Sequence, residues 1–557
     1  MGKIFGLIKN EWIKQYKKIS VKIILILILV ASIAAPFLLK FFNSNNNDLK
    51  WSMESYENQL EWLQVEKDGV DTAAKNAQIN KDIIQVEIDS FNLRMEKKIS
   101  WSDWRDTIIG DMQYKQNMVI MLNGIKSGLK GSDLTNNIYR IDPISLDEYY
   151  ELSSEELQKE IDKFTNEAAE LKNTIENNDY MAYLSGVIKS TEKDIEDSKK
   201  TITTLEADLA KDKENKEIPL EIEALKKSIG TQEELLKAYK YKFDNNIVYD
   251  AKDWKHNTVE HIKMSIEAKN EQLLTEEAFK QQYSWEINRQ GYTYEKYQAD
   301  REERIAKAEE SLTLDWYSLE NNIPQVQFIK DARNSLNETY LFYVTIAILL
   351  CIIIGGGIVS SEYSTGTVRL LMIRPVSRWK ILFSKLAAVF IMGYGAMFTA
   401  FLLNIVSSGI AHGFGTLGTP MLALKDGVVV HQNFILSLIP NLMFASISLI
   451  FIIAVVFFFS TVGRNTALAV GLTMVGFLGS MPAAQVAANL KMTWIGSTFL
   501  PYVNLTTFAG GESWVLQSLE QMGVTLNATM GAVQLLVIAV VLTVISFVVF
   551  TKRDVTN

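Results

Sequence analysis

Six long apolar runs constrain the fold of this sequence more than any other feature. Charged side chains are nearly absent from them, and each run holds about 20 residues or more, which is the helical length needed to cross a hydrocarbon core of roughly 30 Å. The runs are 21–42, 339–360, 381–408, 434–461, 467–489 and 531–550. We therefore predict an all-α membrane protein with six transmembrane helices.

The lysines and arginines around these runs indicate how the chain crosses the membrane. Basic residues near span ends mark the cytoplasmic side, because they resist translocation. They gather in residues 1–20, in 361–380, at Arg464 and in the tail 551–557. Six crossings bring all four groups to one face. We predict a multi-pass membrane protein with both termini in the cytoplasm and the loop 409–433 outside.

Residues 1–20 precede the first span and have a pattern of their own. Apolar residues alternate with lysines, and Trp12 and Tyr16 carry rings that favour the headgroup level of a bilayer. We expect an amphipathic helix lying in the inner interface. A plain basic tail is the alternative.

The segment 43–338 is rich in Glu, Lys, Asn and Gln, and the predicted topology places it outside the cell. Apolar residues step by three and four in three stretches, which indicates heptads. These stretches are 161–175, 188–209 and 222–243. A polar turn ending at Pro219 separates the last two, so we predict a helical domain containing an antiparallel coiled-coil hairpin with its tip near Lys213. A role in contacting a partner or substrate is favoured over that of a passive spacer.

Two aromatic stretches of this domain stand out, "SWSDWRD" at 100–106 and "WEINRQGYTYEKY" at 285–297. Exposed tryptophan and tyrosine rings can form a platform for carbohydrate or peptide. Packing within the domain is the favoured explanation, since aromatic side chains contribute strongly to cores.

The chain lacks the sequence patterns of the common enzyme and metal sites. It contains no GxxxxGK[ST] loop, so we expect no ATP hydrolysis in this chain. No GxSxG nucleophile motif occurs, and the four histidines have no metal-ligand spacing. We predict that the chain is not an enzyme and holds no cofactor. The net charge of −9 argues against a nucleic-acid partner, which requires a basic surface.

Polar side chains inside the spans are few and deserve individual interpretation. Asn404 and Asn441 are the strongly polar groups at depth. They are our candidates for a transport route, with hydrogen bonding between helices as the alternative and more ordinary role. Lys385 lies near a span end, where we expect its ammonium to reach the interface. The absence of carboxylates within the spans weakens a carrier driven by protons or ions.

The cytoplasmic segment 361–380 has a more specific arrangement of residue types than a loop that only fixes the topology would need. Its apolar residues between the polar start and Pro375 predict a short helix, and Trp379 follows as an interfacial anchor. Arg369 and Arg374 would be presented on this helix. We interpret the segment as a docking element for another protein.

The sequence "SSEYSTGTVRLLMIRPVSRWKILFSKL" resembles the loop between the second and third spans in permeases of the type-2 ABC transporter family. The matching residues are Glu362, Gly366, Thr367, Leu370, Leu371, Pro375, Ser377, Arg378 and Lys385. The six-span layout and the amphipathic amino terminus are similar too. The domain 43–338 lies outside the resemblance, and its size is similar to that of a permease subgroup from Gram-positive bacteria with large extracytoplasmic domains.

This resemblance implies a coupling helix that docks on a separate ATP-binding subunit, which would bind the ATP and Mg. The residues expected to contact that subunit are Glu362, Gly366, Thr367, Arg369, Leu370, Leu371, Arg374, Pro375 and Arg378. The family also implies a re-entrant helical pair in 490–530. The partners expected are two ATP-binding subunits, a second permease subunit of the same or a similar kind, membrane lipid, and an extracellular peptide or envelope component at the outer domain.

We expect export of an amphipathic molecule such as an antimicrobial peptide. Two alternatives remain open from the sequence. One is a non-transporting surface protein, a receptor or envelope scaffold with a coiled-coil ectodomain. The other is ion extrusion driven by the same kind of ATPase.

Overall fold

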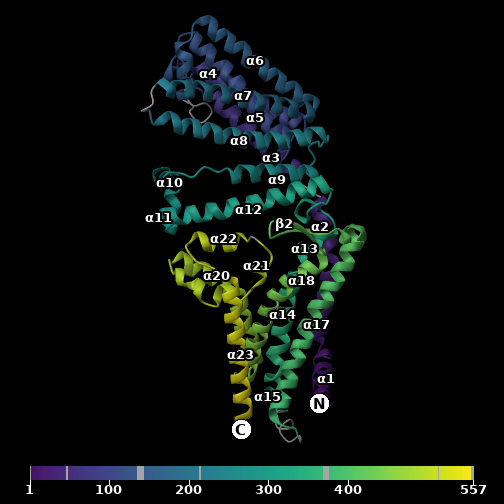
Figure 1. Ribbon diagram of the computed structural model, residues 1–557. Helices are drawn as coiled ribbons and strands as arrows, with labels where there is room; N and C mark the ends of the chain where they lie inside the picture. Colours follow the sequence, from purple (N-terminus) through teal and green to yellow (C-terminus); the bar gives the residue numbers. More distant parts are fainter. Residues whose placement is uncertain are drawn as a thin grey trace. The chain divides into compact units, whose positions relative to one another are not determined.

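The computed structural model describes residues 2–44, 48–134, 143–211, 215–367, 376–511 and 513–552. The chain divides into two compact units. One comprises Ser44–Val259, and the other combines Met1–Asn43 with Glu260–Asn557. We call the first the helical unit and the second the bundle unit, and each is described by itself (Figure 1).

Six helical segments of the described chain are long and apolar enough to cross a membrane, which confirms the predicted all-α membrane protein. They are Ile19–Phe42, Ala332–Ser364, Arg378–His412, Phe434–Val462, Thr466–Asn489 and Ala528–Lys552. The helices that form them are α2 (Ile19–Ser44), α13 (Ala332–Thr339), α14 (Phe342–Ile358), α15 (Ser360–Ser364), α17 (Arg378–His412), α18 (Phe434–Ala445), α19 (Ile447–Val462), α20 (Thr466–Asn489) and α23 (Ala528–Lys552). Before them lies α1 (Gly2–Tyr16).

Helix α14 is the central helix of the bundle unit. It packs against α17, α19 and α20, and its span is the most buried of the six. Glycines permit this closeness: a Cβ on Gly355 would lie 2.6 Å from Val456 of α19, and one on Gly356 would lie 2.3 Å from Val470 of α20. Small residues at such contacts let helix backbones approach closely inside a membrane.

The chain bends between α14 and α15, and a serine of a neighbouring helix stabilises the bend. The Ser460 hydroxyl accepts hydrogen bonds from the backbone N–H groups of Val359 and Ser360, at 3.3 and 3.1 Å. The same hydroxyl donates to the Gly356 carbonyl at 2.9 Å. Backbone groups freed at the bend are therefore satisfied inside the protein, as an apolar environment requires.

The predicted outer loop 409–433 contains a β-hairpin that our sequence analysis did not assign. Strands β1 (Met421–Lys425) and β2 (Val428–Gln432) pair antiparallel, with Lys425 opposite Val428. The two-residue turn is Asp426 and Gly427, both with positive φ, at 51° and 78°. An Asp-Gly pair is a strong hairpin signal, because this turn type requires left-handed backbone at both positions.

The segment 490–530 forms short helices packed against the bundle. They are η5 (Thr493–Ser497), η6 (Leu500–Tyr502), α21 (Thr506–Ala509) and α22 (Trp514–Gln521). Tyr502 is fully buried, and its hydroxyl donates to the Gly496 carbonyl at 2.7 Å. Whether this element re-enters the membrane stays a prediction.

Residues from Glu260 to Asp331 group with the spans, so the expected domain 43–338 is divided in the structure. The elements here are the end of α9 (Trp254–Lys269), α10 (Glu276–Gln282), α11 (Ser284–Gln290), α12 (Tyr294–Asn321) and η3 (Val326–Phe328). Phe279 and Tyr297 are buried in an aromatic cluster with ring centroids 5.4 Å apart. Packing thus accounts for most of the aromatic stretch at 285–297, although Trp285 is exposed.

The helical unit is built from helices that pack in pairs. Its elements are α3 (Asp48–Asp68), α4 (Ala77–Glu96), α5 (Trp104–Lys126), η1 (Gly131–Asp133), η2 (Pro143–Glu151), α6 (Ser154–Asn177), α7 (Tyr180–Lys211), α8 (Glu217–Asp244) and the start of α9. The first heptad stretch lies on α6, which packs chiefly on α5. Its apolar residues join two separate clusters, one around Ile161 and Phe164 and one around Ala168 and Ile175.

Helices α7 and α8 carry the other two heptad stretches and pack against each other. Their seam is formed by Ile195, Ile202, Ile222 and Ile229. Ion pairs flank it, Lys199 with Glu233 at 2.8 Å and Lys226 with Glu206 at 3.4 Å. As the residue number rises on one helix it falls on the other, so the two helices run antiparallel. The predicted tip at Lys213 lies outside the described residues.

Candidate functional site

A buried ion pair lies where the segment 361–380 leaves one span and where the chain has entered the next. Glu362 of α15 is 4% exposed and Lys385 of α17 is 1% exposed. Lys385 Nζ lies 3.2 Å from Glu362 Oε1. Ionised groups are rarely this buried unless paired. The pair therefore fixes the two ends of the segment to each other.

Helix α1 contributes two further charges to this cluster. Lys385 Nζ donates to Glu11 Oε2 at 3.0 Å, and Lys14 Nζ donates to Glu362 Oε1. Helix α1 packs along α17, with Gln15 buried and Trp12 and Tyr16 exposed. The face of α1 that is covered is mixed, with Leu7 and Ile8 beside Glu11 and Gln15, while the rings of Trp12 and Tyr16 are exposed, as an interfacial helix needs.

The start of the segment is ordered by a turn around Glu362. The Thr367 hydroxyl donates to Glu362 Oε2. Gly366 has a φ of 70°, a left-handed conformation that glycine adopts without steric cost. Three predicted contact residues, Glu362, Gly366 and Thr367, are therefore brought together here. The remaining members of the predicted contact set that precede Arg378 lie outside the described residues; they are Arg369, Leu370, Leu371, Arg374 and Pro375.

Arg378 begins α17 and ties the end of the segment to the last span. Its Nη1 donates to the Thr551 carbonyl at 3.2 Å, near the end of α23. A cation near a helix carboxyl terminus also interacts favourably with the exposed carbonyl dipoles. The segment is thereby attached to α15, α17, α1 and α23.

Lys18 is a third lysine of this cluster and is less favourably placed. A Cβ on Gly357 would lie 3.8 Å from Lys18 Nζ, so the amine sits over the glycine face of α14. Burial lowers the pKa of Lys18, and the ammonium groups of Lys14 and Lys385 lower it further. The carboxylates of Glu11 and Glu362 oppose this lowering of the Lys18 pKa.

The structure corrects our expectation for Lys385 and adds two residues. Lys385 does not reach an interface; it is buried because two carboxylates offer it closer partners than water would. Glu11 and Lys14 were treated only as part of a basic, amphipathic helix. The sequence did contain a signal for the pairing of Glu11 with Lys385. Glu11 is the only acidic residue before Asp48, and Lys385 is the only charged residue between Lys380 and Lys425.

Asn404 and Asn441, the candidates for a transport route, have different surroundings. Asn404 is fully buried, its amide donates to Thr339 Oγ1 at 2.6 Å and to the Tyr343 hydroxyl, and its carbonyl accepts from Ser408 Oγ at 2.9 Å. This is the interhelical role, because both polar ends of the side chain are used within the chain. Asn441 is exposed on α18 and hydrogen-bonds with Tyr340.

Within the ranges that the structure describes, no group of three or more His, Cys, Asp or Glu side chains has the arrangement of a metal site. The cluster at Glu362 is composed of alternating cations and carboxylates, which satisfy one another. We call this cluster of Glu11, Lys14, Glu362 and Lys385 the junction, because it joins helices through ion pairs that are strong where water is excluded. The expectation that this chain lacks a cofactor stays a prediction.

Comparison with known proteins gives a family-model match within the bundle unit and similarity to two proteins over part of the chain. The family model described as "Protein of unknown function (DUF2705)" matches residues 314–556. Two proteins of Bacillus subtilis (strain 168) are similar. "Uncharacterized protein YhcI" is 32% identical over 257 residues, which are 44% of this chain and 76% of YhcI. "Uncharacterized membrane protein YdbK" is 25% identical over 209 residues, 37% of this chain and 76% of YdbK.

The identity to YhcI and the share of YhcI that is covered decide the family. The chain belongs to the family of YhcI. The family match includes Glu362, Lys385 and Arg378 but not Glu11 or Lys14, so only the part of the junction on α15 and α17 lies within it, and the helical unit lies outside it. No solved structure matches the chain significantly.

Proposed function

We propose that this chain is the permease subunit of an ATP-driven ABC transporter, energised by a separate ATP-binding subunit that docks on the segment 361–380. The resemblance of that segment to the coupling loop of type-2 permeases supports the proposal. The membrane character of the chain is consistent with it. ATP and Mg would be bound by the partner, two copies of which would serve a pair of permease subunits.

The observation that carries the proposal is the attachment of both ends of the segment. A docking helix transmits force only if it moves the spans with it, which requires stiff connections. Glu362 and Lys385 join the two ends through a buried ion pair, and Glu11 extends this junction to α1. Displacement of the segment would therefore move α15, α17 and α1 as one body rather than bend a loop.

The distribution of basic residues supports the orientation that this mechanism needs. Segment 361–380 and both termini share the cytoplasmic face in our assignment, and the helical unit is extracellular. The ATP-binding subunits would act from the cytoplasm. The substrate would pass at the interface of two permease subunits, and export of an amphipathic molecule agrees with the apolar surfaces of the spans. Asn441, which is exposed, remains a candidate for that route, whereas Asn404 is occupied within the chain.

Copurification with the ATP-binding subunit tests the docking. The tagged full chain should retain an ATPase subunit in mild detergent, and the double variant R369E/R374E should lose it, because charge reversal disrupts a docking surface. The matched control is K193E/K200E, a double reversal on the exposed part of α7. Absence of any ATPase subunit with the unaltered chain, even after crosslinking, would favour the scaffold alternative.

A second experiment separates docking from force transmission. E362Q removes the carboxylate charge that Lys14 and Lys385 share and leaves Arg369 and Arg374 in place. Glu362 belongs to the contact set expected from the sequence, but it is 4% exposed and paired within the chain. We therefore expect the ATPase subunit to remain bound and its activity to lose dependence on the permease. Loss of binding in E362Q as complete as in R369E/R374E would contradict a role in transmission.

A further inference from the structure

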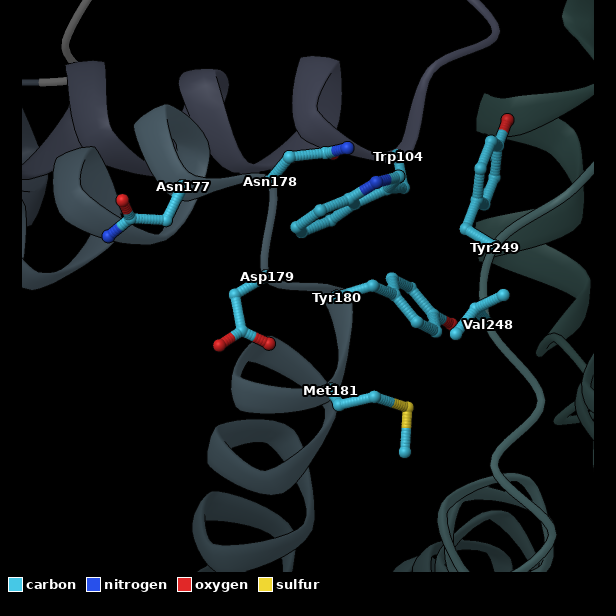
Figure 2. Close-up of a pocket in the computed structure, with 8 residues that line it drawn as sticks. All are labelled: Trp104, Asn177, Asn178, Asp179, Tyr180, Met181, Val248 and Tyr249. Carbon is cyan, nitrogen blue, oxygen red and sulfur yellow. The ribbon is translucent and has the colours of Figure 1, made fainter.

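The helical unit contains a pocket of about 550 Å³, a volume within the range of small-molecule sites. Three segments line it (Figure 2): the first turn of α5 with Trp104, the connection 177–181 between α6 and α7, and the pair Val248 and Tyr249 after α8. The connection is tight because α6 ends at Asn178 with a left-handed φ of 52°. The turn places Tyr180 directly beside Trp104.

Aromatic rings form one side of this pocket. The ring centroids of Trp104 and Tyr180 are 5.1 Å apart with planes at 80°, and those of Tyr180 and Tyr249 are 6.2 Å apart at 52°. All three side chains are only partly buried. The rings therefore support one another and still present surface to a ligand, unlike the fully buried Tyr56 elsewhere in this unit.

The charges around the pocket select against an ionic ligand. Lys242 is 1% exposed, and its Nζ lies 4.9 Å from the centre of the Tyr180 ring, so a buried cation already occupies that ring. A cationic ligand would have to share the Tyr180 ring with it. At the rim, Asp179 Oδ1 accepts from the Ala182 N–H at 2.8 Å, which holds an exposed carboxylate where an anionic ligand would enter. A neutral ligand is favoured.

The polar groups of the rim are suited to hydroxyls. Asn178 and Asp179 supply an amide and an exposed carboxylate at this rim, and the Asn178 amide lies beside Trp104 (Figure 2). The Asn177 side chain points away from the rings, and its amide donates to Asn173 Oδ1 at 2.9 Å. A pyranose sugar has the matching character: polarised C–H groups on one face, which favour the negative face of an aromatic ring, and hydroxyls around its edge. Carbohydrate is therefore the class of ligand that can use both the aromatic rings and the polar rim.

Peptide ligands fit this pocket less well. Addition of a peptide strand requires a free sheet edge, and the described part of the helical unit contains helices and no strand. An amphipathic helix requires a groove with anchor pockets on successive turns. The eight lining residues form a compact pocket rather than such a groove.

We propose that this pocket binds a neutral carbohydrate, with Trp104 and Tyr180 stacking on a sugar ring and Asn178 bonding its hydroxyls. The extracellular placement proposed above would present the pocket to envelope glycans. Binding itself requires no ATP-binding subunit, so this inference and the proposed function can fail separately.

Saturation-transfer NMR on the full chain tests the proposal, with N,N′-diacetylchitobiose and maltose as probes. A polyoxyethylene detergent is needed, because maltoside and choline headgroups would compete for the pocket. Irradiation of aromatic protons should transfer saturation to the ring protons of at least one sugar. W104L should weaken that binding at least fivefold, and W101L, which alters an exposed tryptophan outside the pocket, should leave it unchanged.

A second variant keeps the proposal testable if W104L fails to fold. N178G keeps the left-handed turn, since glycine adopts it freely, and removes only the amide. We expect it to weaken sugar binding about two- to fivefold while the α7 amides keep their hydrogen-exchange protection. Absence of transfer to both sugars at millimolar concentration would overturn the proposal. So would equal binding by W104L, or tetramethylammonium binding more tightly than either sugar.

Discussion

The two units of this protein use charge in opposite ways. In the helical unit, ion pairs such as Lys199 with Glu233 lie on the surface, with both side chains more than half exposed, and the apolar residues form several small clusters. In the bundle unit one large apolar core dominates, and Lys385 with Glu362 is buried beside it. The exposed pairs of the first unit are exchangeable, whereas the buried pair of the second is specific to its position.

The largest effect should come from removing the buried cation. K385M leaves Glu11 and Glu362 without their shared partner, and breaking a buried pair by removing one partner costs about 3–5 kcal/mol. K18M is the matched control, because Lys18 is a lysine of the same cluster whose charged form is disfavoured there. Thermal unfolding of the purified chain in detergent measures both. Equal losses in the two variants would show that Lys385 contributes no more to the cluster than Lys18 does.

The seam between α7 and α8 should give the next largest effect. I229A removes three heavy atoms from a side chain that is 7% exposed, and such truncations cost about 2 kcal/mol or more. The control is L220A, on the same helix but 66% exposed. Hydrogen exchange should show faster opening of α7 and α8 in I229A alone. Equally fast exchange in L220A would mean that the heptad seam contributes no more to stability than an exposed side chain does.

The features that were predictable from sequence are those encoded by local patterns. A run of apolar residues defines a span wherever it packs, and the six spans agree with the prediction to within a few residues at most ends. The heptads of α7 and α8 are local in the same way. The β-hairpin was available too, from the Asp426-Gly427 pair.

The features that escaped prediction depend on contacts between distant residues. Glu11 and Lys385 are 374 positions apart, and no spacing pattern links them. Their pairing follows from α1 packing on α17, which sequence periodicity does not specify. The division of 43–338 at Val259 has the same origin, because it falls inside α9 and no break in the helical pattern marks it.

The exposed pairs should contribute little. For Lys199 and Glu233, a double-mutant cycle with K199A and E233A should yield a coupling of about 0.2–1 kcal/mol that decreases with added salt. The helical unit's local stability, measured by hydrogen exchange, is the appropriate readout. A coupling as large as the loss in K385M would remove the distinction between the two units.

The smallest effect concerns a carboxylate of the helical unit that lacks a buried partner. Partial burial raises the pKa of Asp111, and Lys115 opposes this shift. A carboxylate whose pKa is higher in the folded state favours folding most below its unfolded pKa of about 3.9, and that contribution is lost as the pH rises through the folded pKa. At neutral pH the charge is therefore slightly unfavourable, so D111N should flatten the rise in α5 opening between pH 4 and 6 without destabilising the unit at pH 7. Lys115 keeps Glu167 as a partner, which limits any secondary loss. A clear destabilisation of D111N at pH 7 would mean that this surface charge is position-specific after all, as Lys385 is in the bundle.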